Sequence, residues 1–403
     1  MAQIVGNRTS KQVIDEQRIV RSVYPDISYL DPDETPLVTF LNRLKGRKQG
    51  TFNPELEWFE SDYAARWATM GTGTVFSSSS STLVTVTDGT LFIAGDLFIV
   101  PKAETSSTAP EMCRVTAVSG NTLTVVRNVG GTGVDTINPS THLRLVGSAF
   151  EENGAFPSSK TTSPVRYYNY TQIVRTATDF SGTLMATKNY GGDERARVHR
   201  EKLVEHKEKL NSMLLWGQRS YSATGGPTSN PIRTSNGLNN VISTNVTDIG
   251  GILTPKKLDN FFQQGFRYGR KKKLFLVAPK IRSAVNAWAV NFLNVRPSEE
   301  RYGVKITTIE TPYGDAMMVH DWMLETPSGG TNGFQGWGFL IDLDQINYKY
   351  LNGNGENRDT KIIKDAVKNG QDGKKDEILS EVGYEIKQEK YHSKMFGVTD
   401  YMS

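Results

Sequence analysis

The sequence is poor in the residues that build most metal and redox sites. Cys113 is the only cysteine among 403 residues, and there are only five histidines. One thiol cannot form an intrachain disulfide or complete a cysteine zinc site, so we expect a reducing compartment. We interpret Cys113 as a small apolar side chain that fills space in a strand. The sequence therefore predicts no bound metal and no cofactor.

Long apolar runs and a strong charge imbalance are also absent. No stretch approaches the roughly 18 apolar residues that a membrane-spanning helix requires, and the first residues lack the apolar core of a signal peptide. The 47 Lys and Arg residues nearly balance the 43 Asp and Glu residues, which leaves a net charge of +4. This bias is too weak to indicate a dedicated nucleic-acid-binding protein, although it is compatible with one face that meets nucleic acid. We expect no membrane partner and synthesis in a cytoplasm.

The composition changes character along the chain. The length predicts two or three folded units, and 37 glycines predict many turns. Short β-rich runs lie close together between residues 82 and 150, separated by turn signals such as Asp88-Gly89 and Gly130-Gly131. This spacing predicts a small antiparallel barrel or sandwich. Because the segments on either side differ in character, we interpret it as an inserted domain.

The strongest helix signals lie between residues 191 and 217. Asp193 is a candidate N-cap and Gly217 a candidate C′ residue, with leucines at helical spacing between them. This pattern predicts a rod of roughly 35 Å. Thr254-Pro255 and Pro279 open shorter helices that alternate with strands up to about residue 370. The fold class that follows is α+β.

A search for catalytic chemistry finds only weak candidates. His199 and His206 are seven residues apart on the long helix, whereas a shared zinc ion prefers a spacing of four. We therefore interpret both histidines as part of a solvated helix face. The serines from Ser77 to Ser81 have no visible activating base, so a flexible loop is the favoured interpretation. No catalytic residue is predicted.

Two charged clusters each allow a functional alternative. The first is acidic and aromatic, and its Glu57 and Glu60 could in principle form the carboxylate pair of a glycoside hydrolase. An assembly contact or a solvated edge is the favoured interpretation. The full cluster contains Glu55, Glu57, Glu60 and Asp62 among Trp58, Phe59 and Tyr63.

The second cluster is the basic run Arg270-Lys271-Lys272-Lys273, directly before a predicted strand. It could contact phosphates. A cationic cap on the end of a helix, followed by a solvated turn, explains the run equally well.

Four short motifs occur in order along nearly the whole chain. They are Ile27–Leu37, Glu57-Trp58 with Asp62, Asn169–Ile173 with Ser181-Gly182-Thr183, and Glu381–Ile386 with His392 and Gly397. Together they resemble the major head proteins of tailed bacteriophages with the Hong Kong 97-type capsid fold, in the group whose extended loop carries a β insertion. Each motif alone is weak, whereas their order and spacing are fairly specific. The charged segment 352–375 departs from the pattern.

The resemblance implies a domain plan for the whole chain. An N-terminal arm would reach onto neighbouring subunits, and a long spine helix would support the peripheral domain. The implied domains are 1–46 as the arm, 47–81 and 151–181 as the limbs of the extended loop, 82–150 as the inserted β domain, 182–244 as the peripheral domain, 245–370 as the axial domain, and 371–403 as C-terminal strands returning to the peripheral and axial domains.

The implied function is that of a shell subunit and not an enzyme. Copies would form pentamers and hexamers of an icosahedral head that encloses double-stranded DNA, with the protein found in the virion after assembly in the host bacterial cytoplasm. A portal, a separate scaffold or none, and decoration proteins would be further partners. An encapsulin-like compartment is the alternative. Aromatic side chains on the arm and loop would find their partners on sister copies; they are Phe40, Trp58, Phe59, Trp67, Tyr167 and Tyr170.

Isopeptide cross-links between subunits are known in this fold class. They need a lysine, an asparagine and a nearby carboxylate from different subunits. The limbs offer Lys48 and Lys160, but nothing in the sequence marks either as reactive. We predict no cross-links.

Overall fold

The computed structural model describes residues 36–44, 46–72, 82–102, 106–134, 136–188, 193–289, 299–301, 304–325, 333–365 and 372–401. Helices account for 21% and strands for 42%, which confirms the predicted α+β class. The chain divides into two compact units. The first contains Met1–Trp58 and Tyr167–Ser403, and the second contains Phe59–Arg166. The domain plan implied by the resemblance stays a prediction.

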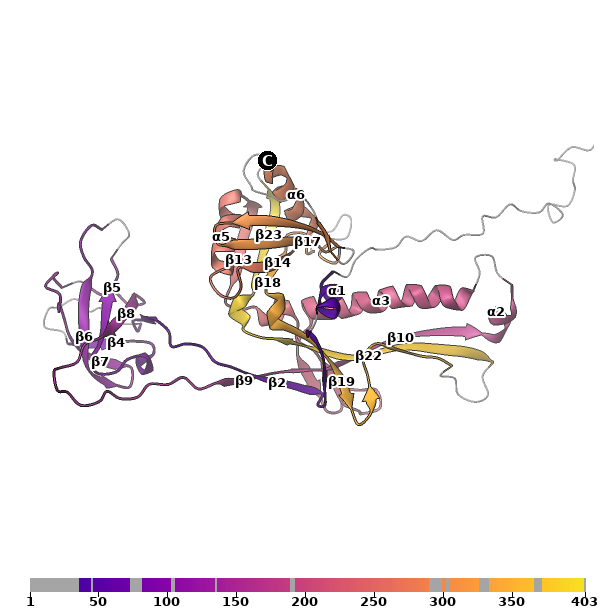
Figure 1. Cartoon of the computed structure of the whole chain (residues 1–403), viewed down its shortest axis with the longest axis horizontal. Helices are drawn as coiled ribbons and strands as arrows, with labels where there is room; N and C mark the ends of the chain where they lie inside the picture. The colour runs from indigo at the N-terminus through magenta and orange to yellow at the C-terminus, as the bar shows by residue number, and fades with distance from the viewer. Residues whose placement is uncertain are drawn as a thin grey trace, which may run out of the picture. The chain divides into compact units, whose positions relative to one another are not determined.

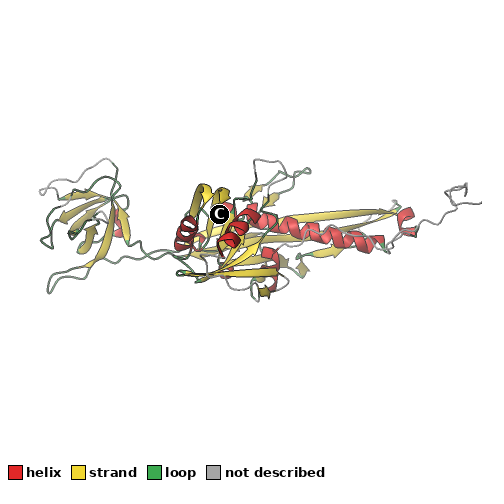
Figure 2. Cartoon of the chain, turned by 90° about the horizontal axis from the view of Figure 1, so that it is seen from above, coloured by secondary structure: helices red, strands yellow, loops and turns green. Residues whose placement is uncertain are grey.

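A long helix beside a long strand pair dominates the first unit (Figure 1). The helix α3 spans Glu194–Trp216. Its predicted ends are confirmed, because Asp193 accepts a hydrogen bond from the backbone N–H of Arg195 at 3.0 Å and the N–H of Gly217 donates to a carbonyl of the last turn. Seen from above, α3 lies over the strands (Figure 2).

The strands beneath α3 belong to a sheet built from distant parts of the chain. β10 and β22 pair in antiparallel fashion along the whole length of β10, and β19 joins β22 on its other side. β1 completes the sheet by a parallel pairing with β19. The bounds are β1 Lys48–Thr51, β10 Gln172–Ser181, β19 Ile346–Gly353 and β22 Gly373–Ile386, with the short strands β20 Glu356–Asn357 and β21 Lys361–Ile363 attached.

A seven-stranded sheet forms the other part of the first unit, in the order β13-β23-β18-β14-β17-β16-β15. The helices α5 and α6 pack their apolar faces against it, and Phe261, Val285 and Trp288 are buried with sheet side chains in one core. The bounds are β13 Val246–Leu253, α5 Pro255–Gly265, β14 Lys272–Val277, α6 Pro279–Ala289, β15 Glu299–Arg301, β16 Val304–Thr311, β17 Gly314–His320, β18 Gly338–Ile341 and β23 Ser393–Tyr401.

The two sheets draw their strands from segments that are far apart in the sequence. β19 lies within the segment 245–370, yet it pairs with β1 and β22 and not with the seven-stranded sheet. β23, near the end of the chain, is an interior strand of the seven-stranded sheet, between β13 and β18. Strand pairing over such sequence distances leaves no local signal.

Short elements complete the first unit, and two strands, β2 and β9, cross its boundary with the second unit. α1 and α3 meet in a core that contains Leu37, Leu41, Leu210 and Leu214. Thr35, the predicted N-cap of α1, lies outside the described residues. The remaining elements are α1 Pro36–Arg43, β2 Glu55–Glu60, β9 Val165–Tyr170, α2 Gly182–Ala186, β11 Ser220–Ser222, β12 Ile232–Thr234, α4 Leu238–Val241 and the 3-10 turns η3 Leu343–Gln345 and η4 Glu389–Tyr391. β2 pairs with β9, and β11 with β12.

The second unit is a six-stranded barrel. Its strand order is β3-β8-β5-β6-β7-β4, and a bridge between Met70 and Val86 joins the two end strands. The N–H of Gly71 also donates to Thr85 O at 2.8 Å across this seam, which closes the barrel around its own core. The bounds are β3 Trp67–Thr69, β4 Leu83–Thr85, η2 Gly89–Leu91, β5 Asp96–Val100, β6 Glu111–Ser119, β7 Thr122–Val126 and β8 His142–Ser148.

No helix in the described ranges combines the length and apolar character needed to cross a bilayer.

Candidate functional site

Three of the six aromatic side chains that the resemblance assigns to subunit contacts, Phe59, Trp67 and Tyr167, are exposed in the single chain. Phe59 is 69% exposed and Tyr167 is 46% exposed. Trp58 is half-buried because its ring stacks on Tyr167, with the two ring centroids 6.4 Å apart. Tyr170 is half-buried as well. The side chain of Phe40 lies outside the described residues.

Trp67 is placed differently from the expectation, because it begins β3 of the barrel. The guanidinium of Arg144 on the neighbouring strand lies 5.2 Å from its ring centroid. Phe52 and Phe156, which the sequence did not mark as contact residues, are 88% and 102% exposed, and Tyr63 of the acidic and aromatic cluster is 101% exposed. Several large apolar side chains exposed to water often mark an interaction surface, so these positions add to the candidate contact surface.

The motif Asn169–Ile173 begins with a buried asparagine whose side chain hydrogen-bonds to several segments. The Nδ2 of Asn169 donates to Tyr384 O at 2.6 Å and to Ser235 Oγ at 3.1 Å. Its Oδ1 accepts from the N–H groups of Tyr170 and Asn236, both at 2.8 Å. One side chain thus joins β9 to β22 and to the segment before α4.

An aromatic ladder continues from the same motif. The Arg219 guanidinium lies 4.0 Å from the centroid of the Tyr168 ring and donates to the Tyr168 carbonyl at 2.7 Å. The Tyr170 ring lies between those of Tyr168 and Tyr221, with centroids 5.7 and 5.8 Å away. The interaction between a guanidinium and the face of an aromatic ring is favourable. These stacked side chains therefore hold the C-terminal end of β9 against the β11–β12 hairpin. No sequence motif pointed to Arg219.

The interpretation of His199 and His206 as a solvated face is wrong. His206 is fully buried, with Thr176 Oγ1 at 3.1 Å from its Nδ1 and Ser380 Oγ at 2.7 Å from its Nε2. Burial, with a smaller effect of Lys209, lowers the pKa of His206 to about 4. The seven-residue spacing places both histidines on the helix face that meets the β10–β22 pair, which the local sequence could not reveal.

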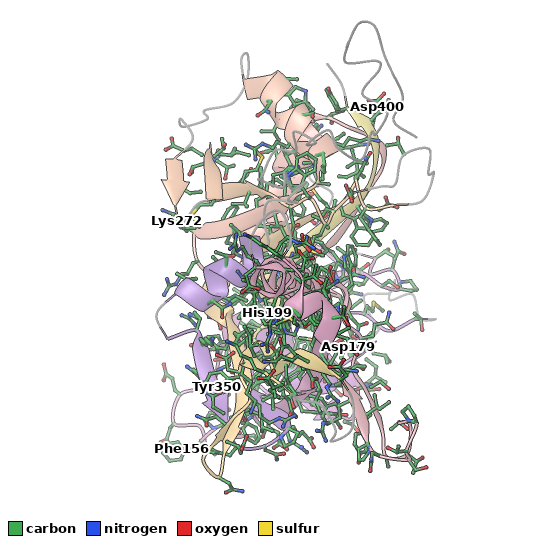
Figure 3. The ribbon with its side chains drawn as sticks, turned by 90° about the vertical axis from the view of Figure 1, so that its right-hand side faces the viewer. Phe156, Asp179, His199, Lys272, Tyr350 and Asp400 are labelled. Atoms are coloured by element: carbon green, nitrogen blue, oxygen red, sulfur yellow. The ribbon has the colours of Figure 1, made fainter. Side chains whose placement is uncertain are left out.

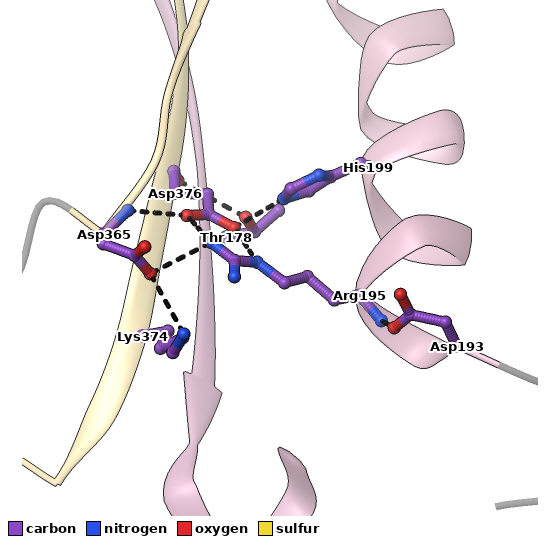
Figure 4. A network of polar contacts seen from close by, with 7 residues as sticks. All are labelled: Thr178, Asp193, Arg195, His199, Asp365, Lys374 and Asp376. Carbon is purple, nitrogen blue, oxygen red and sulfur yellow. Dashed lines mark hydrogen bonds and ion pairs between the residues drawn. The ribbon is translucent and has the colours of Figure 1, made fainter.

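His199 reaches a buried carboxylate near the start of α3 (Figure 4). Its Nε2 lies 2.6 Å from Asp376 Oδ2, and Arg195 donates to both oxygens of Asp376 at 2.6 Å. The bidentate Arg195 contact is the main reason why the pKa of Asp376 lies well below its usual range. Asp365 adds its N–H to Asp376 and accepts from Arg195, while Lys374 lies 3.7 Å from Asp365. Ion pairs therefore hold the first turns of α3, where few apolar side chains are buried.

A second buried carboxylate, Glu381 on β22, collects charged and polar partners. Arg358 donates to it, Arg233 lies 3.4 Å away, and the Thr171 hydroxyl donates at 3.3 Å. Glu381 begins the closing motif of the resemblance, but its partners come from three other segments. The sequence alone did not identify this arrangement.

The hydrolase alternative gains no support from the geometry. Glu57 and Asp62 are exposed, and Glu55 and Glu60 are half-buried on β2. The residues Ser77–Ser81 lie outside the described part of the chain. Within that part, no group of three or more His, Cys, Asp and Glu side chains is placed to hold a metal ion.

The basic run divides into an inner and an outer part. Lys273 is buried in β14, and its ammonium donates to the carbonyls of Gly265 and Tyr268 at 2.7 Å and Tyr391 at 2.6 Å. Gly265 is the last residue of α5, so the expected cationic helix cap is confirmed for Lys273, whereas the expected solvated turn is wrong for it. Burial lowers the pKa of Lys273 to about 8. Arg270, Lys271 and Lys272 are exposed.

Cys113 and the two candidate cross-linking lysines, Lys48 and Lys160, contact other parts of the chain. Cys113 is buried in the barrel, as predicted, and burial together with Glu111 raises the pKa of its thiol to about 12. Lys48 pairs with Asp359, and Lys160 lies 3.8 Å from Asp96. The absence of cross-links stays a prediction.

Comparison with known proteins gives this architecture a family. The sequence profile described as SU10 major capsid protein matches residues 4–399. The major capsid protein of Pseudomonas phage PaMx41 is 26% identical over 166 residues, which are 41% of this chain and 38% of that protein. The match thus spans well under half of the relative's length.

Two solved structures are similar at a coarse level. The capsid of the native GTA particle covers 98% of this chain and 100% of its own, with 7% identity and a TM-score of 0.48. The SrpI encapsulin of Synechococcus elongatus PCC 7942 covers 60% of this chain and 80% of its own, with 14% identity and a TM-score of 0.44. The family profile spans almost the whole sequence, and the chain therefore belongs to the SU10 major capsid protein family.

Proposed function

We propose that this chain is the shell subunit of a tailed-phage head with the Hong Kong 97-type fold. Copies assemble into pentamers and hexamers, which close an icosahedral shell around double-stranded DNA. Assembly takes place in the host bacterial cytoplasm, and the finished protein resides in the virion. The role is structural, without catalysis, as the family indicates.

The observation that carries the proposal is the exposure of aromatic side chains on extended segments. Phe52, Phe59 and Tyr63 are more than two-thirds exposed on or beside β2. A monomeric protein rarely leaves such side chains in water without a partner. Repeated copies in closed rings can bury them, and many such contacts per subunit add up to a stable shell.

The parts of the chain take the roles that the resemblance implies. β2 and β9 belong to the limbs of the extended loop, the barrel is the inserted domain, α3 is the spine of the peripheral domain, and the seven-stranded sheet is the axial domain. A portal, a scaffold and decoration proteins are further partners. The family profile favours this function over the encapsulin-like alternative.

Electron microscopy of the purified chain tests the proposal. We expect rings or closed particles under assembly conditions, with a scaffold protein supplied where one is needed. Replacing Phe59 and Tyr63 by serine should abolish particles while the soluble chain keeps its circular-dichroism spectrum, because neither side chain contributes to a core.

Val146→Ser is the matched control, since Val146 is 56% exposed on β8 of the barrel. This variant should assemble normally. A wild-type chain that stays monomeric under every assembly condition would overturn the proposal. Particles formed as readily by the Phe59 and Tyr63 variant would overturn the role of these aromatic side chains.

A further inference from the structure

The loop between α5 and β14 carries a dense positive charge. Arg267, Arg270, Lys271 and Lys272 are exposed on it, and Lys272 lies at the surface of the seven-stranded sheet (Figure 3). Lys273, the next residue, points inward and is buried. The four exposed cations therefore lie next to a buried residue, Lys273, that fixes the segment in the protein.

An open hollow of about 590 Å³ lies between this loop and the turn that joins β16 to β17. Its polar lining consists of Arg270, Lys271, Lys272, Thr311, Tyr313 and Asp315. Three cations thus face a single carboxylate. The volume exceeds that of a phosphate group, so an anion and its hydration water fit inside.

The two lysines have their charges available. Arg270 already pairs with Asp344. Among the residues that the structure describes, no carboxylate lies within ion-pair distance of Lys271 or Lys272, and Asp315, the register partner of Lys272, forms no ion pair with it. Two lysine ammonium groups in a lining that holds only the Asp315 carboxylate leave a net positive charge, which attracts an anion from solution.

The backbone around the hollow is firmly held. The Asp315 N–H donates to Lys271 O at 2.7 Å, and the Arg270 N–H donates to Asp342 Oδ2 at 3.2 Å. Gly314 fits so closely that a Cβ atom there would lie 2.4 Å from Lys271 O. With Lys273 tied to three carbonyls beneath, the loop is organised before any ligand arrives.

We infer that this hollow binds phosphate groups through Lys271 and Lys272. Lysine ammonium groups contact phosphates as point charges and without sequence preference. The inference rests on the proposed function for the source of the phosphates, which is the backbone of the enclosed double-stranded DNA. A free oligophosphate offers the same chemistry, and the experiment separates the two sources.

Fluorescence anisotropy of the full chain with a labelled 20-base-pair duplex of random sequence tests the inference. The test variant is Lys271→Gln with Lys272→Gln. The matched control is Lys207→Gln with Lys364→Gln, which changes the net charge equally at two exposed lysines elsewhere. A Lys271→Arg with Lys272→Arg variant retains the charge and shows that the loop still folds.

We expect the test variant to bind the duplex more weakly than the control, with the charge-retaining variant close to wild type. The logarithm of the affinity falls with the logarithm of the salt concentration at a slope of about 0.9 per neutralised phosphate. Loss of two phosphate contacts therefore makes the fall in affinity between 50 and 200 mM salt about twelvefold smaller for the test variant than for wild type. Inorganic triphosphate is the second probe, added as a competitor of the bound duplex. If triphosphate displaces the duplex from wild type and from the test variant at the same concentrations, DNA is the source of the phosphates. Displacement specific to wild type and control identifies free oligophosphate as a ligand.

The inference is overturned if the test variant and the control bind both probes equally. Particle formation by the same variants is scored separately by electron microscopy. Normal particles with unchanged DNA binding would refute the phosphate site and leave the proposed shell function intact. Failure of the wild type to form particles, with duplex binding still dependent on Lys271 and Lys272, would refute the shell and leave the phosphate site.

Discussion

Single buried polar residues hold together segments that are far apart in the sequence. Asn169, His206, Lys273, Asp376 and Glu381 are each at most 2% exposed, and each bonds to partners from other elements. A buried polar group is tolerated only when its hydrogen bonds are satisfied. Removal of one such side chain should therefore cost more than its size suggests.

Asn169→Ala should lower the free energy of unfolding of the first unit by about 3 kcal/mol, because it leaves buried partners on β22 and before α4 without their hydrogen bonds. Urea denaturation followed by circular dichroism measures the change. Asn230→Ala removes an exposed amide and should have little effect. Equal stabilities for the two variants would contradict the role of Asn169.

His206 predicts a pH dependence with a definite sign. Its pKa is lowered from 6.5 to about 4 in the folded chain, so the unfolded chain binds more protons between these values. The contribution of the neutral His206 side chain to the free energy of unfolding is fully present above pH 6.5 and is lost as the pH falls towards 4. The free energy of unfolding falls by up to about 1.4 kcal/mol per pH unit in this range. His206→Gln should flatten this part of the stability curve.

The exposed His142 provides the control for this experiment. His142→Gln should leave the dependence between pH 6.5 and 4 as steep as in the wild type. His320 and His392, whose burial also lowers their pKa, keep a residual slope in both variants. An unchanged slope in His206→Gln would contradict a neutral buried imidazole at this position.

At the scale of elements, helix ends were predictable and helix faces were not. Asp193 and Thr254 act as N-caps at the positions that the sequence indicated, because capping depends on residues two or three positions away. The burial of His206 depends on Ser380, which is 174 residues distant. Local periodicity cannot report such a contact.

The same distinction applies to the candidate site. The aromatic positions Phe59 and Tyr167 could be chosen from residue type and segment, and they are exposed as expected. Trp67 was misplaced because its pairing with β8 spans 77 residues of sequence. The partners of Glu381 and the stacking of Arg219 on Tyr168 likewise follow from tertiary structure.

Gly314→Ala should destabilise the turn between β16 and β17 by about 2 kcal/mol, because the added methyl group meets Lys271 O and the Phe266 ring. Thermal unfolding monitored by circular dichroism measures the loss. Gly147→Ala is the control, since nothing lies within 4 Å of a Cβ atom there. A Gly314→Ala variant as stable as this control would show that the turn can move away.

At the scale of the whole molecule, the barrel has its own closed sheet and core, and the chain enters and leaves it side by side. β3 and β8 are adjacent, and Leu145 N donates to Arg66 O at 3.0 Å. We expect residues 59–166 to fold when expressed alone. Replacing 66–148 by a short glycine and serine linker should leave the first unit folded.

Calorimetry checks both parts of this prediction. The isolated barrel should give one cooperative transition, and the shortened chain should keep the transition assigned to the first unit. The full chain should show both. Loss of all cooperative unfolding from either piece would show that the two units depend on each other for stability.

The place of β23 in the middle of its sheet has a consequence for synthesis on the ribosome. β13 touches the rest of the seven-stranded sheet through β23, and β10 meets β19 only across β22. Neither sheet can close until residues 373–401 have been translated. A tethered nascent chain therefore lacks both finished sheets, and we expect it to join other copies only after its release.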